Sequence, residues 1–252
     1  VLTVEGNFST DNNGLTKDVA ILAYSSGYIS SYTNRLWLYT ADPVNNRRME
    51  RTISGLSGAV GNNDDKEDNH FTDPYTPYNY LDLAVGDFDG DGIDEIAVYD
   101  GNYRTPAVTV WKLQKTSGDA FLTNSNWQKA WTRDLPKTDG LVPNMVSLAA
   151  ADIDKDGIDD LAISYGYYKY QGAAQASKAV VLMGADNGQM MTRSYELDLG
   201  TVYRAGLTAG DVDNDGRNEL MVGGSSSPTN RDARYLAIYG WNGTGFDKLA
   251  AQ

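Results

Sequence analysis

Three copies of one short acidic pattern constrain this chain more than any other feature of its sequence. We call them loop 1 (residues 87–95), loop 2 (residues 152–160) and loop 3 (residues 211–219). Each loop carries carboxylates at positions one, three, five and nine, and glycine at position six. Alternate side chains of such a loop converge on one point, the glycine permits a sharp turn, and the seventh residue can offer its backbone carbonyl. The spacing predicts a loop that surrounds a calcium ion with oxygen ligands.

The residues that follow each loop exclude an EF-hand. In an EF-hand, position twelve carries a bidentate Glu and the chain continues as a helix. Here position twelve is Val98, Ile163 or Val222, each within a short apolar run that is typical of a buried strand. Apolar runs also precede the loops, at residues 81–85, 145–150 and 205–209. The predicted unit is therefore strand, calcium loop, strand.

These loops with their flanking strands resemble the FG-GAP/VCBS repeats of integrin-α-like β-propellers. In that family each repeat is one four-stranded blade, and calcium lies in the loop between its first and second strands. The resemblance implies an all-β fold, a β-propeller and three structural Ca²⁺ sites. The ligands it implies are Asp87, Asp89, Asp91, Ile93 and Glu95 in loop 1, Asp152, Asp154, Asp156, Ile158 and Asp160 in loop 2, and Asp211, Asp213, Asp215, Arg217 and Glu219 in loop 3.

Further apolar runs complete four repeats. Third and fourth strands are predicted at residues 35–39 and 48–53, 107–111 and 131–135, 179–183 and 192–197, and 235–239 and 246–249. We predict one β-propeller domain or propeller segment over residues 1–252, with blades at about 1–55, 80–137, 144–199 and 204–252 and an inserted loop at 56–79. A closed four-bladed ring and a part of a larger seven- to eight-bladed ring both fit, since propellers have about four to eight blades. The start at Val1 rather than Met slightly favours an excised part of a larger ring.

The segment between the first two predicted strands stands where a fourth calcium loop would lie. It offers Asn7, Asp11, Asn13 and Asp18 as oxygen donors, but it is longer than the other loops and short of carboxylates. We interpret it as a turn that is stabilised by its own Asx side chains, and metal binding there is left undecided.

Composition limits the classes of function. The 252 residues have a net charge of −13, which argues against a nucleic-acid partner and an anionic membrane surface. There is no cysteine, so no disulfide or thiolate site can form, and His70 is the one histidine. No run approaches the roughly 20 apolar residues that span a bilayer, so membrane insertion is not expected. Weak calcium loops suit about millimolar calcium, which predicts a secreted or cell-surface location.

Tyrosines gather in the loops that would lie opposite the calcium loops. Twelve of the 17 tyrosines fall there, beside Ser, Gly and Asn, a composition typical of binding surfaces. For any one of them, packing against neighbouring loops is the alternative. The candidate ligand contacts are Tyr28, Tyr32, Tyr103, Tyr167, Tyr168, Tyr170 and Tyr203.

The leading functional prediction is a calcium-stabilised propeller module for binding or adhesion, without catalytic residues. It would recognise a glycan or an extracellular protein through the Tyr-rich face, and further blades from the same parent or another chain are possible partners. One alternative is the propeller domain of a secreted polysaccharide lyase, which needs a cationic group beside its base. Another is a structural spacer of a surface protein. The cationic candidates for a lyase are Arg104, Lys169, Arg204, Arg231 and Arg234.

Overall fold

The computed structural model describes most of the chain as strands that are joined by turns. The described residues are 2–7, 18–25, 32–42, 47–53, 59–60, 82–99, 106–113, 127–137, 143, 145–167, 176–185, 189–230 and 232–251. Within these ranges the chain forms no helix, and accordingly none that is long and apolar enough to cross a bilayer.

The strands form four antiparallel sheets, which we call blades 1 to 4 in chain order. Blade 1 contains β1 (Leu2–Gly6), β2 (Asp18–Ser25), β3 (Tyr32–Asp42) and β4 (Arg47–Ile53), with β5 (Ala59–Val60) paired to β3. Blade 2 contains β6 (Asp82–Gly86), β7 (Glu95–Tyr99), β8 (Ala107–Leu113) and β9 (Trp127–Asp134). Blade 3 contains β10 (Met145–Ala151), β11 (Asp160–Gly166), β12 (Lys178–Leu182) and β13 (Ser194–Leu197). Blade 4 contains β14 (Tyr203–Gly210), β15 (Glu219–Ser225), β16 (Arg234–Trp241) and β17 (Phe246–Ala251).

This architecture confirms the predicted all-β fold of four-stranded units. Each acidic loop joins the first strand of its blade to the second, as the apolar runs on either side predict. The short strand β5 was not expected, because it falls in the segment that the sequence assigned to an inserted loop. Its residues Ala59 and Val60 pair with Thr33 and Tyr32 of β3.

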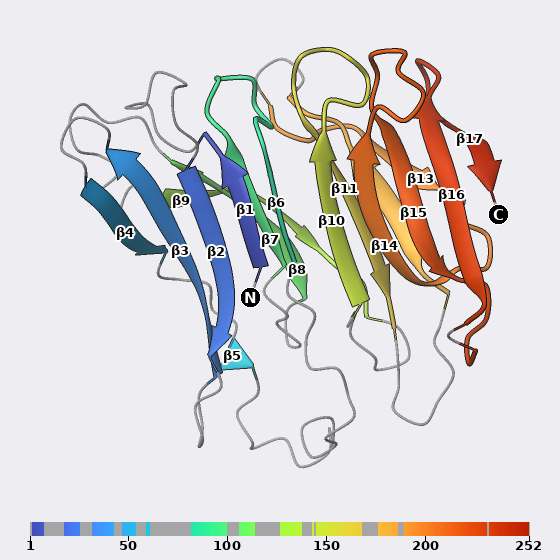
Figure 1. The fold of residues 1–252 in the computed structure, drawn as a ribbon, viewed down its shortest axis with the longest axis horizontal. Coiled ribbons are helices and arrows are strands. Elements are labelled where there is room, and N and C mark those ends of the chain that lie inside the picture. The colour runs from blue at the N-terminus through green and yellow to red at the C-terminus, as the bar shows by residue number, and fades with distance from the viewer. Residues whose placement is uncertain are drawn as a thin grey trace.

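The blades stand side by side, from blade 1 at the left of Figure 1 to blade 4 at the right. Their first strands follow one another, since β1 lies beside β6, β6 beside β10, and β10 beside β14. Loops 1 to 3 all lie at the top of this view. The described sheets form an open row and not a closed four-bladed ring.

Two apolar clusters hold blades 2, 3 and 4 together. One cluster packs Phe88 of blade 2 against Leu161 and Ile163 of blade 3, and the other packs Ile153 of blade 3 against Leu220 of blade 4. Every residue of β7 and β11 is buried because sheets cover both faces of these strands. Burial of apolar area at about 25 cal/mol per Å² makes such contacts the main stabilising term of a propeller. The register of the blades therefore fixes where the acidic loops lie.

Blade 4 differs from blades 2 and 3 because one of its faces is uncovered. Position two of the acidic loop is Phe88 in blade 2 and Ile153 in blade 3, with exposed fractions of 0% and 1%. The same position in blade 4 is Val212, which is 45% exposed. Leu236 and Leu249 of this blade are also exposed, at 48% and 56%. We call the surface of Val212, Leu236 and Leu249 the outer face of blade 4.

Candidate metal centres

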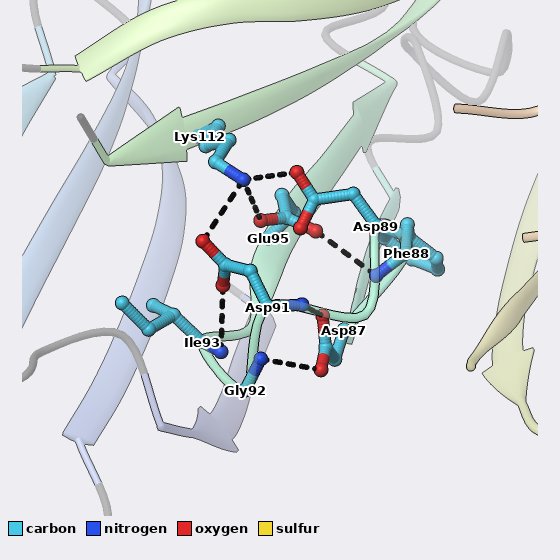
Figure 2. Close-up of polar contacts among 8 residues, drawn as sticks. All are labelled: Asp87, Phe88, Asp89, Asp91, Gly92, Ile93, Glu95 and Lys112. Atoms are coloured by element: carbon cyan, nitrogen blue, oxygen red, sulfur yellow. Dashed lines mark hydrogen bonds and ion pairs between the residues drawn. The ribbon is translucent and has the colours of Figure 1, made fainter. Parts of the chain in front are cut away.

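Loop 1 is built around the carboxylate of its first residue. The amides of Asp91 and Gly92 donate to the two carboxylate oxygens of Asp87, at 3.0 and 2.8 Å. The amide of Ile93 donates to Oδ1 of Asp91 at 3.0 Å, which closes the turn (Figure 2). Asx side chains stabilise turns by accepting such bonds from their own backbone. Position one therefore orders the loop in addition to offering oxygen to a cation.

The carboxylate at position nine ties the end of each loop to its beginning. In loop 1 the amide of Phe88 donates to Oε2 of Glu95 at 2.9 Å. The same four bonds recur in the other loops, at 2.9–3.1 Å in loop 2 and 2.8–3.2 Å in loop 3. Three loops that are far apart in sequence thus have one internal hydrogen-bond pattern.

The backbone of each loop turns twice through the left-handed region. Position six is glycine in every loop, with φ of 84°, 90° and 84°, as the sequence predicts. Position four is also left-handed, at Gly90 (73°), Lys155 (65°) and Asn214 (63°). This second requirement was missed, because Lys at position four gives no signal for positive φ, whereas Asn tolerates it.

The structure brings together the carboxylates of positions one, three and nine. Their nearest oxygens lie within 4.8 Å of one another in each of the three loops, in the groups Asp87, Asp89 and Glu95, Asp152, Asp154 and Asp160, and Asp211, Asp213 and Glu219. The carboxylates at position five instead accept the amide of position seven, at Asp91, Asp156 and Asp215. Coordination by position five and by the carbonyl oxygens of Ile93, Ile158 and Arg217 stays a prediction.

Burial makes the position-nine carboxylates of loops 1 and 2 poor anions unless a cation is present. Glu95 is fully buried, and this burial, with the nearby charge of Asp89, raises its pKa to about 8. Burial likewise raises the pKa of Asp160 to about 7. Three buried oxygens, Oδ1 of Asp89, Oε1 of Glu95 and Oδ1 of Asp154, accept no hydrogen bond within the described part of the chain. Buried polar atoms are rarely left so, and an oxygen-only donor set with unsatisfied oxygens fits a calcium ion.

Loop 1 differs from the other loops because a lysine points into it. The ammonium of Lys112 on β8 bonds to Oδ2 of Asp89, and lies 3.1 Å from Oδ2 of Asp91 and 3.7 Å from Oε1 of Glu95 (Figure 2). Burial alone would lower the pKa of Lys112, but the bonds to Asp89 and Asp91 and the charge of Glu95 raise it overall. Sequence reasoning missed Lys112, because it lies on the third strand of the blade.

Position eight links each loop to the preceding blade. The amide of Asp87 donates to Oδ2 of Asp159 at 3.0 Å, and the amide of Asp159 donates to the carbonyl of Asp87, also at 3.0 Å. Asp94 makes the same pair of contacts with Asn7, at 2.7 and 2.9 Å. In loop 3 the side-chain amide of Asn218 donates to the carbonyl of Asp152 at 2.9 Å. We call these three contacts the interblade ladder; Asn7 thus stands where position one of a fourth loop would be.

The structure tests part of the tyrosine prediction. Tyr28, Tyr103, Tyr168 and Tyr170 lie outside the described residues, as does the side chain of Tyr32. Tyr203 begins β14 and is partly exposed. Tyr167 is 4% exposed, its hydroxyl donates to the carbonyl of Pro136, and its ring packs edge-on against Tyr165. The side chain of Tyr167 therefore packs between blades 2 and 3, and its contact with a ligand stays a prediction.

Two hollows lie at the blade ends opposite the acidic loops. One, of about 480 Å³, lies between blades 2 and 3 and is lined by Arg133, Tyr165, Lys178, Glu196 and Asp198, among others. The second, of about 360 Å³, lies where the first strands begin, and Asp82 and Arg204 line it. The first hollow thus offers both signs of charge beside an aromatic ring.

The cationic candidates for a lyase are only partly described. Arg104, Lys169 and Arg231 lie outside the described residues. The guanidinium of Arg204 donates to the carbonyl of Pro228 at 3.2 Å, and Arg234 begins β16 with an exposed side chain. Asp82 lines the same hollow as Arg204; burial raises its pKa, while bonds from the amides of Leu148 and Leu83 act in the opposite direction.

Comparisons with known proteins find a repeat family, a curated relative and a solved structure to which this chain is similar. Residues 146–182, which run from β10 through loop 2 to β12, match the FG-GAP repeat family. The chain is 28% identical over 174 residues to integrin alpha pat-2 of Caenorhabditis elegans. The match covers 62% of this chain and 13% of that protein, so the chain spans only a small part of this relative. A crystal structure of exo-inulinase from Aspergillus awamori aligns with a TM-score of 0.44 and 11% identity, over 99% of this chain and 51% of that chain.

Proposed function

We propose that this FG-GAP repeat domain, a relative of integrin α, is a calcium-stabilised propeller module that binds an extracellular ligand. The observation that carries the proposal is the repeated loop. Three loops share one set of hydrogen bonds and bring three carboxylates together. Such sites neutralise buried negative charge and join the first two strands of a blade, so the role of the metal is structural.

Each proposed calcium site draws its oxygens from one blade. Asp152, Asp154 and Asp160 would hold an ion in loop 2, and Asp211, Asp213 and Glu219 would hold one in loop 3, while loop 1 has the equivalent group of Asp87, Asp89 and Glu95. Bound calcium in loop 2 supplies positive charge to the carboxylate of Asp160, which otherwise stays partly protonated at neutral pH, as its raised pKa of about 7 indicates. We therefore expect calcium to raise the unfolding temperature.

The end opposite the acidic loops is the proposed binding surface. The hollow between blades 2 and 3 combines the ring of Tyr165 with charged groups from Arg133, Lys178, Glu196 and Asp198. Glycans and extended peptides suit a surface of this kind, because an aromatic ring supplies contact area and charged groups supply directional bonds. We propose a binding role without catalysis, in which a glycan or an extracellular protein is the ligand.

The outer face of blade 4 is proposed to receive a further blade. Val212 is the counterpart of Phe88 and Ile153, which the following blade buries completely or almost so. An exposed surface that repeats the apolar positions of two blade contacts favours a third contact of the same kind. The described sheets would then be part of a larger propeller, completed by blades from the same parent or from another chain.

An extracellular or cell-surface location follows from the same proposal. Loops of this kind suit sites where free calcium is about millimolar, as it is outside cells. The C. elegans relative is an integrin α, which favours that location and a role in adhesion.

The experiment compares ligand binding in calcium and in chelator. The purified chain is applied to a glycan array and to a panel of extracellular matrix proteins in about 1 mM calcium, then again in chelator. We expect selective binding that Arg133→Ala or Lys178→Ala weakens at least about tenfold, with Lys129→Ala outside the hollow as the control. A folded chain that binds nothing on either panel would overturn the binding role. An unfolding temperature that is equal in calcium and in chelator would overturn the calcium role.

A further inference from the structure

Loop 1 contains a cation of its own, and this separates it from loops 2 and 3. The ammonium of Lys112 contacts the carboxylates of Asp89, Asp91 and Glu95, which are positions three, five and nine of the loop (Figure 2). These are the positions that the repeat pattern assigns to a bound ion. Lys112 therefore sits where calcium would have to enter.

The register of the sheets shows that the other loops have no lysine at this place. Ile96, Leu161 and Leu220 pair with Trp111, Leu182 and Tyr239 on the third strands. The residue after each partner is Lys112 in blade 2, Met183 in blade 3 and Gly240 in blade 4. Neither Met nor Gly carries charge, so this strand position supplies an amine to loop 1 and not to loops 2 and 3.

A second cation lies near loop 2, but it is peripheral. The guanidinium of Arg193 is 3.8 Å from Oδ2 of Asp154, and its side chain is 41% exposed. It contacts one carboxylate of the loop, whereas Lys112 contacts three. At loop 3 the ammonium of Lys155 lies beside Gly216, but it forms no ion pair with the loop 3 carboxylates among the described residues.

We infer that Lys112 is a tethered substitute for the metal in loop 1, so that this loop stays closed without calcium and loops 2 and 3 take up the ions. The inference rests on the proposed calcium-binding role. Calcium needs about six to eight oxygens at 2.3–2.6 Å. The ammonium of Lys112 bonds to Asp89 and Asp91 and lies 3.7 Å from Oε1 of Glu95, so it excludes the ion, because both cannot occupy one carboxylate cluster. Displacing a tethered amine leaves two like charges close together and weakens calcium binding.

The test counts bound ions in the full chain. The metal-free protein is titrated with calcium by isothermal calorimetry up to about millimolar concentration. We expect the native chain to bind two ions and Lys112→Met, which installs the residue of blade 3, to bind three. Lys129→Met is the matched control, since Lys129 lies on the neighbouring strand with its ammonium 5.4 Å from the Trp111 ring, and it should bind two ions. In Lys112→Met, loop 1 should gain affinity roughly tenfold or more.

A second set of variants keeps the test decisive if Lys112→Met does not fold. Asp89→Asn in loop 1 should leave the ion count of the native chain unchanged, while Asp213→Asn in loop 3 should lower it by one. The Lys112→Met protein should also unfold at a lower temperature in chelator than the native chain, because its carboxylates lose their counter-charge.

The outcomes separate this inference from the function on which it rests. Three ions of similar affinity in the native chain, or one ion lost on Asp89→Asn, would overturn the role of Lys112 and leave the calcium role standing. A native chain that binds no calcium would overturn both.

Discussion

Removing the side chain of Asp159 tests whether the interblade ladder stabilises the protein. Its carboxylate accepts the amide of Asp87 in the preceding blade at 3.0 Å, and its own amide donates back at 3.0 Å. Asp159→Ala removes the first bond and keeps the second. A hydrogen bond to a charged group contributes about 1.5–3 kcal/mol. Burial raises the pKa of Asp159, so part of that gain is already offset by desolvation.

We therefore expect Asp159→Ala to lower the free energy of unfolding by about 1–2 kcal/mol. For a chain of this size that corresponds to a fall of about 2–8 °C in unfolding temperature. The measurement is thermal unfolding followed by circular dichroism, in calcium and in chelator. Asp159→Asn is the matched control, because it keeps an oxygen for the amide of Asp87 and because Asn218 occupies this position in blade 4.

A double-mutant cycle that combines substitutions of Gly86 and Asp159 tests the same contact. A Cβ atom at Gly86 would lie 2.7 Å from the Cβ atom and from Oδ2 of Asp159, so Gly86→Ala forces the ladder contact apart. We expect Gly86→Ala to be destabilising in the native chain and much less so in an Asp159→Gly background, which lacks both the carboxylate and the Cβ atom that lies 2.7 Å away. Equal costs of Gly86→Ala in both backgrounds would refute the ladder as a stabilising contact. An Asp159→Ala protein with the same unfolding temperature as the native chain would also refute it.

Three further predictions concern the loops and the sheet faces. Asp154→Ala should lower the unfolding temperature in calcium and hardly in chelator, since it removes a ligand of loop 2; equal losses in both would argue against a metal there. In chelator, the stability that protonated Asp160 contributes should decline as pH rises from about 4 to about 7, because burial raises its pKa to about 7. Urea titrations over a pH series measure this decline, and Asp160→Asn should flatten it. Ile153→Ala should cost about 2–5 kcal/mol in urea unfolding, whereas Val212→Ala at the same position of blade 4 should cost less than about 1 kcal/mol; similar costs would contradict the uncovered face.

The sequence predicted those features that depend on neighbours along the chain. The spacing of Asp87, Asp89, Asp91 and Glu95 is a local signal, and the loop is built almost entirely from hydrogen bonds within nine residues. The apolar runs beside the loops are also local, because each strand of a blade is short and is buried on at least one face. For these reasons the strands and their order were predicted well.

The sequence did not predict features that depend on sheet register and on the packing of one blade against the next. Lys112 reaches Glu95 because β8 lies beside β7, and its spacing from loop 1 follows no pattern that marks a metal site. Asp159 bonds to a residue 72 positions earlier in the chain, so position eight looked like an ordinary loop residue. Tyr167 was assigned to a surface by composition, but the neighbouring blade offered its hydroxyl a carbonyl.

The interblade ladder connects metal binding to the contact between blades. Asp152 is both the first residue of loop 2 and the partner of Asn218 in loop 3, so an ion that fixes the carboxylate of Asp152 also fixes the backbone to which the next blade bonds. A calcium site in this chain therefore stabilises a junction between two blades in addition to one turn. A lysine at loop 1 would then keep the junction of blades 2 and 3 closed when calcium is low, while the junction of blades 3 and 4, where Asn218 bonds to Asp152 of loop 2, would depend on the ion. Loss of calcium should loosen blade 4 first. Amide hydrogen exchange should then become faster in β14 than in β6.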